Sequence, residues 1–157
     1  MNIVRLVNQL KIDEGVRSTP YRDTEGLLTV GIGRNLDHVG LSQDEMNMIG
    51  IDQSFDLSKL VLTNNQVEIL CMNDIKGVCD DLDRNIPWWR DLSDLRQEAL
   101  ANMCFNLGWH RMSKFKNMLS AMRSGDFERA GVEALDSKWA RQVGNRAIRI
   151  KDMIVTG

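Results

Sequence analysis

Residues 21–33, which read YRDTEGLLTVGIG, differ in period from the sequence on either side of them. Turn-forming residues at the start of this stretch precede an alternation of apolar residues with small or polar ones. One face of the expected strand carries Leu28, Val30 and Ile32, and the other face carries Thr29 and Gly31. A period of two residues is typical of a half-buried strand, so the stretch predicts a small β-sheet.

Helix patterns surround this stretch. Residues 2–14 have apolar positions at helical spacing, with Asn2 as the N-cap and Gly15 as the stop. Residues 42–45 (SQDE) and 63–66 (TNNQ) are capping boxes, and the second opens a helix of about twenty residues. Between the two boxes we expect irregular structure with one short helix. Further helices are expected near residues 93–107, 113–123, 126–135 and 145–155.

These elements predict a mostly α-helical α+β fold with two lobes. A small N-terminal β lobe is expected over about residues 15–62, and a larger helical lobe over about residues 63–157 together with the helix at 2–14. The long helix joins the lobes, and a cleft between them is the expected ligand site. A chain of 157 residues with no linker or repeat has the size of one domain, so residues 1–157 are expected to form a single domain.

The charges of the chain are distributed unevenly. The formal net charge is −2, but residues 1–83 carry 7 Lys or Arg and 14 Asp or Glu, whereas residues 84–157 carry 13 and 8. A basic half suits an anionic polymer as ligand, although such charges are equally consistent with ordinary solvated helix faces. No nucleic-acid partner is expected, because no helix is rich in base-reading residues and the acidic half would repel phosphate.

Cysteine spacing argues against a disulfide or a metal site. Cys71 and Cys79 are expected eight residues apart on one helix, about 12 Å at the usual rise, which is too far for a disulfide. Together with Cys104 they are interpreted as buried free thiols, and the chain has only two histidines, so we expect no metal and no cofactor. Polar residues interrupt the N-terminal apolar positions, which predicts a soluble chain with no signal peptide and no stable membrane insertion.

Two carboxylates are expected in contrasting surroundings. Glu14 falls in the last turn of the first helix, where unpaired carbonyl groups disfavour the ionised form and favour a protonated acid. Asp23 falls in a polar turn that favours the ionised form, and Thr29 adds a hydroxyl group on the polar face of the adjacent strand. A protonated acid and an ionised partner are what the hydrolysis of a glycosidic bond requires. Taken alone, the same residues are more simply explained as an ordinary helix end, turn and strand, because an acid at a helix end and an Asp in a turn occur in most proteins.

The combined sequence pattern of three segments is more specific than the two carboxylates alone. Residues 11–15 (KIDEG), 21–26 (YRDTEG) and 28–33 (LTVGIG) closely resemble the opening of the T-even bacteriophage lysozymes. Those enzymes carry a Glu, an Asp and a Thr in this order and at this spacing. The resemblance resumes in residues 102–108, 115–119, 137–139 and 145–147, and it fails mainly in residues 36–62 and 84–95.

The resemblance implies a lysozyme-like fold and an inverting muramidase, which hydrolyses the β-1,4 bond between N-acetylmuramic acid and N-acetylglucosamine in peptidoglycan. It implies that Glu14 protonates the glycosidic oxygen while Asp23 and Thr29 hold a water molecule on the opposite face of the sugar. It also implies that Arg146 pairs with Glu14. The implied substrate-binding residues are Glu25, Gly33, Asn35, Phe105 and Asn106.

One departure from the family follows the Gly-Ile-Gly stretch. Family members commonly carry a histidine there, paired with an aspartate on the long helix, whereas this chain has Arg34 and, at the matching position, Asp74. We predict an Arg34–Asp74 salt bridge that ties the lobes together. Unlike a histidine pair, it would not titrate near neutral pH.

Several alternatives stay open. A lytic transglycosylase would need only the Glu, and a non-catalytic protein that disrupts the wall or the membrane is a third reading. The resemblance implies a monomeric endolysin that is made in the host cytoplasm, reaches periplasmic peptidoglycan with the help of a holin, and lyses the host. A domain of a larger tail protein is equally consistent with it. Trp139 is interpreted as core, whereas Trp88-Trp89 and residues 109–111 (WHR) have no assigned role.

Overall fold

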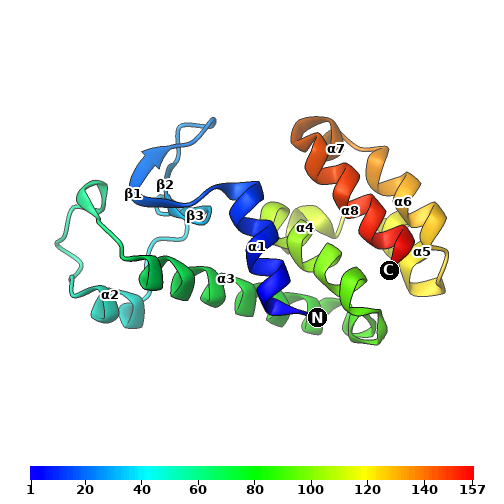
Figure 1. The fold of residues 1–157 in the computed structure, drawn as a ribbon, viewed down its shortest axis with the longest axis horizontal. Coiled ribbons are helices and arrows are strands. Elements are labelled where there is room, and N and C mark those ends of the chain that lie inside the picture. The colour runs from blue at the N-terminus through cyan, green and yellow to red at the C-terminus, as the bar shows by residue number, and fades with distance from the viewer. The chain divides into compact units, whose positions relative to one another are not determined.

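The computed structural model describes residues 1–157 and is mostly helical with one small sheet (Figure 1). In chain order the elements are α1 (Ile3–Glu14), β1 (Arg17–Arg22), β2 (Leu28–Gly31), β3 (Arg34–Asn35), α2 (Gln43–Ile49), the 3-10 helix η1 (Leu57–Lys59), α3 (Asn64–Asn85), the 3-10 helix η2 (Pro87–Asp91), α4 (Asp94–Met112), α5 (Lys116–Ser124), α6 (Phe127–Leu135), α7 (Lys138–Val143) and α8 (Asn145–Thr156). The predicted α+β class is confirmed. No helix is long and apolar enough to cross a membrane.

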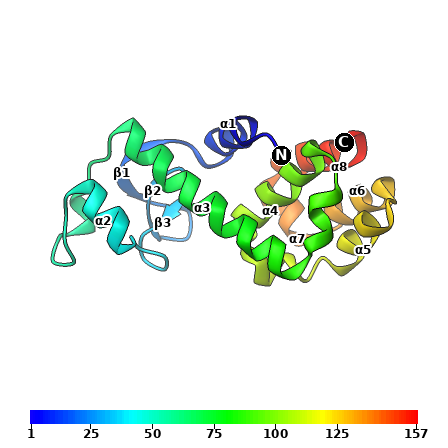
Figure 2. The same cartoon turned by 90° about the horizontal axis from the view of Figure 1, so that it is seen from below.

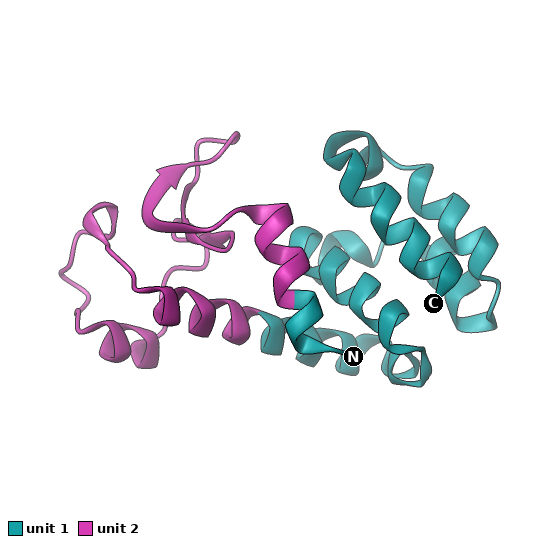
Figure 3. Ribbon diagram, in the orientation of Figure 1, with its two compact units in different colours: residues 1–6, 75–157 teal, residues 7–74 magenta.

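The chain divides into two compact units (Figure 3). Unit 1 comprises Met1–Leu6 and Ile75–Gly157, and unit 2 comprises Val7–Asp74. The boundary falls inside α1 and inside α3, so each of these helices contributes to both units. Unit 2 contains the sheet and α2, and unit 1 contains α4 to α8. The single domain and the cleft between lobes stay predictions.

Unit 2 is built on a three-stranded antiparallel sheet in the order β1-β2-β3, whose strands lie side by side (Figure 2). Thr29 in β2 pairs with Tyr21 in β1 and with Asn35 in β3. Strand β2 ends at Gly31, although the alternation of residues predicts a strand through Ile32. Gly31 has a φ of 66°, which is outside the β region, and it starts the tight turn into β3.

The core of unit 2 combines side chains from β2, from α2, from the first half of α3 and from the segments that connect these elements. It includes Val30, Ile32, Leu36, Met46, Leu60, Leu62, Val67 and Leu70. Both predicted capping boxes are present. Ser42 and Glu45 exchange side-chain and backbone hydrogen bonds at the start of α2, and Thr63 and Gln66 do the same at the start of α3. These reciprocal bonds fix where the two helices begin.

Unit 1 is a group of packed helices in which α6 contacts α5 and α8, while α8 also contacts α4 and α7. Its largest fully buried side chains include Leu82, Trp89, Leu100, Met103, Met112, Met118 and Met122. Helix α4 runs past its predicted end, although Gly108 (φ 73°, ψ 157°) interrupts its helical conformation. Helix α7 is not predicted by the sequence pattern; Ser137 caps it by accepting a hydrogen bond from the Ala140 N–H.

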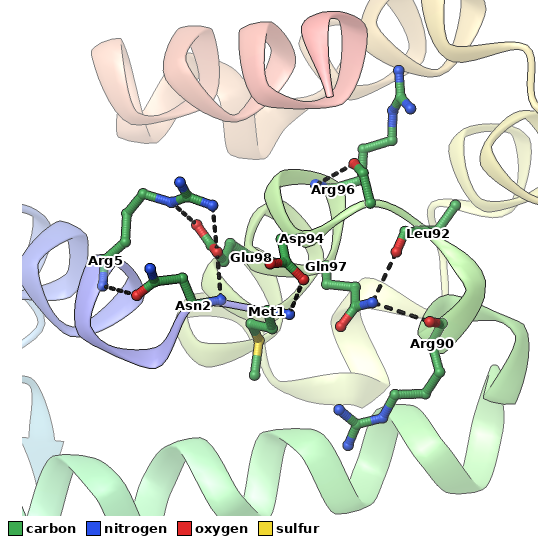
Figure 4. A network of polar contacts seen from close by, with 10 residues as sticks. Met1, Asn2, Arg5, Arg90, Leu92, Asp94, Arg96, Gln97 and Glu98 are labelled. Carbon is green, nitrogen blue, oxygen red and sulfur yellow. Dashed lines mark hydrogen bonds and ion pairs between the residues drawn. The ribbon is translucent and has the colours of Figure 1, made fainter.

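The N-terminal residues are fixed to α4 by a network of polar contacts within unit 1 (Figure 4). Glu98 is fully buried and accepts hydrogen bonds from the Asn2 N–H at 2.7 Å and from Arg5 Nε and Nη2 at 2.6 and 2.8 Å. The Met1 ammonium group pairs with Asp94. Asn2 also accepts a hydrogen bond from the Arg5 N–H, which confirms it as the N-cap of α1. A buried carboxylate without such partners would be costly, so the network determines where α1 begins.

Candidate active site

Glu14 and Gly33, both predicted site residues, lie against each other in unit 2. Glu14 is half-buried at the end of α1, where Gly15 ends the helix with a φ of 74° and donates its N–H to the Lys11 carbonyl. Gly33, in the turn between β2 and β3, has a φ of 70°. A Cβ at this position would lie 3.0 Å from Glu14 Oε2 and 3.1 Å from its Cγ and Cδ. The glycine therefore allows the turn to approach the Glu14 carboxyl group.

Asp23 is held in the turn between β1 and β2 by backbone groups. Its Oδ1 accepts hydrogen bonds from the N–H groups of Glu25 and Leu27, each at 2.9 Å. The Asp23 N–H donates to the Leu27 carbonyl, and the Gly26 N–H donates to the Asp23 carbonyl, each at 3.0 Å. Both side-chain bonds end on Oδ1, so the orientation of the carboxylate is fixed by one of its two oxygens. The Glu25 side chain is exposed beside it.

Thr29 lies in the middle of the sheet and is 5% exposed. Its Oγ1 donates a hydrogen bond to the Leu27 carbonyl at 3.0 Å. A threonine hydroxyl has one hydrogen to donate, so the remaining capacity of Oγ1 is to accept. Thr29 is therefore not the ordinary exposed strand residue of the alternative interpretation.

Tyr21 is electrostatically coupled to both predicted catalytic carboxylates, which the sequence did not indicate. Burial raises the pKa of its hydroxyl group, and the negative charges of Glu14 and Asp23 raise it further. The Arg17 guanidinium group, 4.8 Å above the Tyr21 ring, acts in the opposite direction. The charges of both predicted catalytic carboxylates thus affect the pKa of Tyr21, which also pairs with Thr29 in the sheet. The sequence contains a signal for this residue, because Tyr21 is the first residue of the YRDTEG segment that also carries Asp23.

Asn35 and Asp37 organise the loop after β3. Asn35 Oδ1 accepts hydrogen bonds from the N–H groups of Asp37 and His38, each at 2.9 Å. Asp37 Oδ2 accepts from the Leu28 N–H at 2.8 Å and from the Arg22 guanidinium at 3.1 Å. Asp37 therefore holds the two strand ends that flank the Asp23 turn, a role the sequence did not indicate. The side-chain oxygen of Asn35 already accepts two hydrogen bonds from the loop, so its side-chain NH2 group is the part that can bind a ligand.

Arg34 is 4% exposed and donates all five of its N–H groups within unit 2. Its Nη1 and Nη2 bind the two carboxylate oxygens of Glu45, each at 2.8 Å. Its Nε binds Asp74 Oδ2 at 3.0 Å, and the two remaining N–H groups bind the carbonyls of Gly40 and Leu70 at 3.1 and 3.2 Å. The predicted Arg34–Asp74 salt bridge is thus present, with a closest distance of 2.9 Å.

The role predicted for this salt bridge needs correction. Arg34 and Asp74 both belong to unit 2, so the bridge joins β3 to the first half of α3 within one unit instead of tying two lobes together. Arg34 also binds a second carboxylate, that of Glu45, which the sequence predicted only as a capping residue. Glu45 is also bound by Asn73 Nδ2 at 2.9 Å. The single arginine therefore joins β3, the loop at Gly40, α2 and α3.

The pKa values of the two carboxylates around Arg34 shift in opposite directions. Burial tends to raise the pKa of Glu45, but hydrogen bonds from Arg34, Asn73 and the Ser42 N–H outweigh burial and lower it to about 2. Burial also raises the pKa of Asp74, and there the Arg34 contacts do not outweigh it. For Arg34 itself, burial lowers the pKa while the two carboxylates raise it, with a net increase. Glu45 is therefore the main counter-charge of the buried guanidinium.

Among the predicted site residues of unit 1, Asn106 is in contact with Trp139. The Trp139 indole Nε1 donates to Asn106 Oδ1 at 2.7 Å, and its ring meets Phe115 edge-on at 6.0 Å. Trp139 is 5% exposed, which confirms its assignment to the core. Phe105 is half-buried beside Asn106 on α4. Arg146 is buried and donates from Nε to Asn102 Oδ1 at 2.9 Å; its pairing with Glu14 stays a prediction.

Two cysteines and a further tryptophan are buried and have a structural role. Cys71 and Cys104 are buried free thiols, and burial raises the pKa of both to about 12. No group of three or more His, Cys, Asp or Glu side chains is arranged to hold a metal ion. Trp89 is fully buried and donates from Nε1 to Asp83 Oδ1 at 2.7 Å, so this tryptophan is a core residue of unit 1.

Gly33→Ala is expected to reduce the activity that depends on Glu14 strongly, because the added methyl group strains a positive φ and meets the Glu14 carboxyl group. Gly26→Ala is the matched control. Gly26 has a φ of 78°, but a Cβ there has no atom within 4 Å, so the variant carries the same backbone strain of about 1–2 kcal/mol without the contact. Rates and urea unfolding should be measured for both variants. Equal losses of activity would contradict the stated contact.

Glu45→Gln is expected to cost about 3 kcal/mol of the free energy of unfolding at pH 7, since a carboxylate with a lowered pKa stabilises the fold. This contribution is complete above the unfolded-state pKa of about 4.5 and is lost as the pH falls toward 2. The cost should therefore shrink between pH 5 and pH 3. Asp74→Asn is the control; because the pKa of Asp74 is raised, neutralising it should cost less. Urea unfolding at pH 7, 5 and 3 checks both, and a pH-independent cost of Glu45→Gln would contradict the assignment.

Comparison with known proteins identifies the family of this chain. Residues 11–151 match the sequence profile of the family described as phage lysozyme. The chain is 34% identical over 165 residues to the pre-baseplate central spike protein Gp5 of Enterobacteria phage T4, covering 97% of this chain and 28% of that protein. It is 27% and 29% identical to the probable T4-type lysozymes 1 and 2 of Dictyostelium discoideum, over 96% and 97% of this chain and 93% and 94% of theirs.

The chain thus spans little more than a quarter of the phage relative but nearly the full length of the two lysozymes. The family match covers the α1 end that carries Glu14, the turn that carries Asp23 and most of unit 1. The protein belongs to the phage lysozyme family, whose members are glycoside hydrolases that act on peptidoglycan.

Proposed function

We propose that this protein is an inverting muramidase that hydrolyses the β-1,4 bond between N-acetylmuramic acid and N-acetylglucosamine. The observation that carries the proposal is the arrangement within unit 2. Glu14 lies against the Gly33 turn, Asp23 is fixed by two backbone N–H groups, and Thr29 presents a hydroxyl that can accept. An acid, a fixed carboxylate and an acceptor for a water molecule are the parts that inversion requires.

In the proposed mechanism Glu14 donates its proton to the glycosidic oxygen as the bond to the anomeric carbon breaks. A water molecule attacks that carbon from the opposite face and loses its proton to Asp23. Thr29 Oγ1 orients this water, because its own hydrogen is directed to the Leu27 carbonyl. Inversion needs room for the water, so the two carboxyl groups should lie about 6.5–9.5 Å apart when the substrate is bound.

The proposed substrate-binding residues act in different ways. Glu25 is exposed next to the Asp23 turn, and Gly33 offers backbone to the sugar beside Glu14. The free NH2 group of Asn35 suits the carbonyl of an N-acetyl group, because its Oδ1 is already engaged. Phe105 and Asn106 supply an aromatic and a polar group from unit 1. We also propose that Arg146 pairs with Glu14 and restrains it.

For the biological role we propose an endolysin that lyses the host as a monomer. The chain would be made in the host cytoplasm, form a single lysozyme domain over residues 1–157, require no cofactor, and reach the periplasmic peptidoglycan through a holin partner. The full-length similarity to proteins named lysozymes supports an independent enzyme. The similarity to a central spike protein supports the alternative role as part of a phage tail, which a lysis assay in cells with and without a holin would distinguish.

Glu14→Gln and Asp23→Asn are each expected to reduce the release of reducing ends from purified peptidoglycan by about 10²–10⁴-fold, the usual contribution of a general acid or base. Asp44→Asn, an exposed carboxylate on α2, is the control and should retain full activity. Full lysis by Glu14→Gln would remove this residue from the mechanism and favour a wall- or membrane-disrupting protein without catalysis.

Thr29→Val is expected to lower kcat with little change in KM, since it removes the hydroxyl but keeps the shape of the side chain. Thr29→Ser, which keeps the hydroxyl, should retain most of the activity. Mass spectrometry of the digest separates the proposal from a lytic transglycosylase. Hydrolysis adds a water molecule to the new muramyl end, which then becomes a reducing end. Anhydromuramyl ends would show that the muramyl 6-hydroxyl group, and not water, was the nucleophile.

A further inference from the structure

The turn at residues 23–27, which we call the Asp23 turn, is ordered by its own backbone. The Asp23 side chain accepts two hydrogen bonds from N–H groups within this turn, so these bonds orient the carboxylate relative to the turn. They do not fix the turn relative to the rest of the sheet. The turn joins β1 and β2 at the pair Arg22–Leu28, and Leu28 directly precedes Thr29. The contacts of this pair therefore help to decide how the Asp23 carboxylate lies relative to the Thr29 hydroxyl.

The Asp37 side chain completes the ladder between β2 and β3 at the point where β3 has ended. Thr29 pairs with Asn35 in the register of the sheet, so the next pair along the strands would be Leu28 and Leu36. In an antiparallel sheet such a pair exchanges two backbone hydrogen bonds. The Leu36 N–H donates to the Leu28 carbonyl at 2.8 Å, but the Leu28 N–H donates to Asp37 Oδ2, also at 2.8 Å. The carboxylate thus replaces the backbone acceptor.

The same carboxylate oxygen contacts the other end of the Asp23 turn. Asp37 Oδ2 accepts a hydrogen bond from Arg22 Nη1 at 3.1 Å, and Nη1 also donates to the Gly26 carbonyl inside the turn at 3.1 Å. The side chains of Arg22 and Asp37 are 62% and 38% exposed, and ion pairs this exposed contribute little to stability. What the contact supplies is therefore mainly geometry: one oxygen holds both residues that flank the turn.

Asp37 is itself held by a rigid part of unit 2. Asn35 Oδ1 accepts hydrogen bonds from the N–H groups of Asp37 and His38, and the Asn35 carbonyl accepts from the Gly40 N–H at 3.1 Å. Arg34, which precedes Asn35, is buried and donates from Nη1 to the Gly40 carbonyl. The loop over residues 35–40 is thus fixed at both ends by the Arg34 network, so the Asp37 carboxylate is a firm support for the Asp23 turn.

We propose that Asp37 is a positioning residue for the reaction. By holding the pair Arg22–Leu28, it keeps the Asp23 carboxylate where it can take the proton of a water molecule bound at Thr29. This inference rests on the proposed role of Asp23 as the base. Asp37 acts through Asp23 and makes no contact with the sugar, so its loss should lower kcat and leave KM nearly unchanged.

The first test measures kcat and KM on soluble peptidoglycan fragments. Asp37→Ala is expected to lower kcat about tenfold with KM changed less than about twofold, because a misplacement of 1 Å can cost about 10²-fold and the β1–β2 ladder limits the shift. Asp37→Asn should lose less, since its side-chain oxygen can still accept from the Leu28 N–H. Asp52→Ala is the matched control and should keep full activity; Asp52 is an exposed aspartate of unit 2 that accepts from the N–H and hydroxyl of Ser54.

The second test combines Asp37→Ala with Asp23→Asn and measures the residual activity at higher enzyme concentration. If Asp37 acts only through Asp23, the double variant should be no slower than Asp23→Asn alone. A stability defect would instead lower activity in both backgrounds, and urea unfolding of each variant shows whether it is folded under the assay conditions.

Three results would overturn the proposal: an unchanged kcat for Asp37→Ala, a further tenfold loss in the double variant, or a loss for Asp37→Asn as large as that for Asp23→Asn. The last result would show that Asp37 acts directly on the reacting atoms. Full activity of Asp23→Asn alone would contradict the proposed function itself, and this inference with it.

Discussion

The buried guanidinium group of Arg34 is the interaction on which the architecture of unit 2 depends. It has five N–H groups, and all of them have acceptors: two bind the Glu45 carboxylate on α2, one binds Asp74 and one the Leu70 carbonyl on α3, and one binds the Gly40 carbonyl. A charge buried to this degree is tolerated only when its partners are complete. The loss of one acceptor would leave an unpaired charge in the core, so the sheet, α2 and α3 must keep their relative positions.

This constraint reaches the candidate active site through the two neighbours of Arg34 in the chain. Gly33 precedes it and lies against Glu14, while Asn35 follows it and pairs with Thr29 in the sheet. The short strand β3 therefore connects a structural ion network to two of the three proposed catalytic residues. A histidine offers at most two donors and titrates near neutral pH, whereas an arginine offers five and stays charged. The arginine in this chain thus replaces a simple pair by a network of four acceptors.

Much of this arrangement could be predicted from the sequence. The α1 end, the turn at Asp23, both capping boxes and the Arg34–Asp74 pair follow from local signals or from the family pattern. The bond between Arg34 and Glu45 could not be predicted, because the pattern at Glu45 was already explained by capping. Strand β1 contains Pro20, which argues against a strand, and it is tolerated because β1 is at the edge of the sheet. Helix α7 has only six residues, too few to show a period.

The central claim is that Glu14 and Asp23 act on opposite faces of the sugar, with water as the nucleophile. The most direct test is proton NMR of peptidoglycan fragments during cleavage, recorded before the new reducing ends mutarotate. Because the bond that is cleaved is β, a single displacement by water predicts that the α anomer of the new muramyl end appears first. The β anomer appearing first would show retention, which requires a covalent or two-step mechanism, and would contradict the assignment of Asp23 and Thr29.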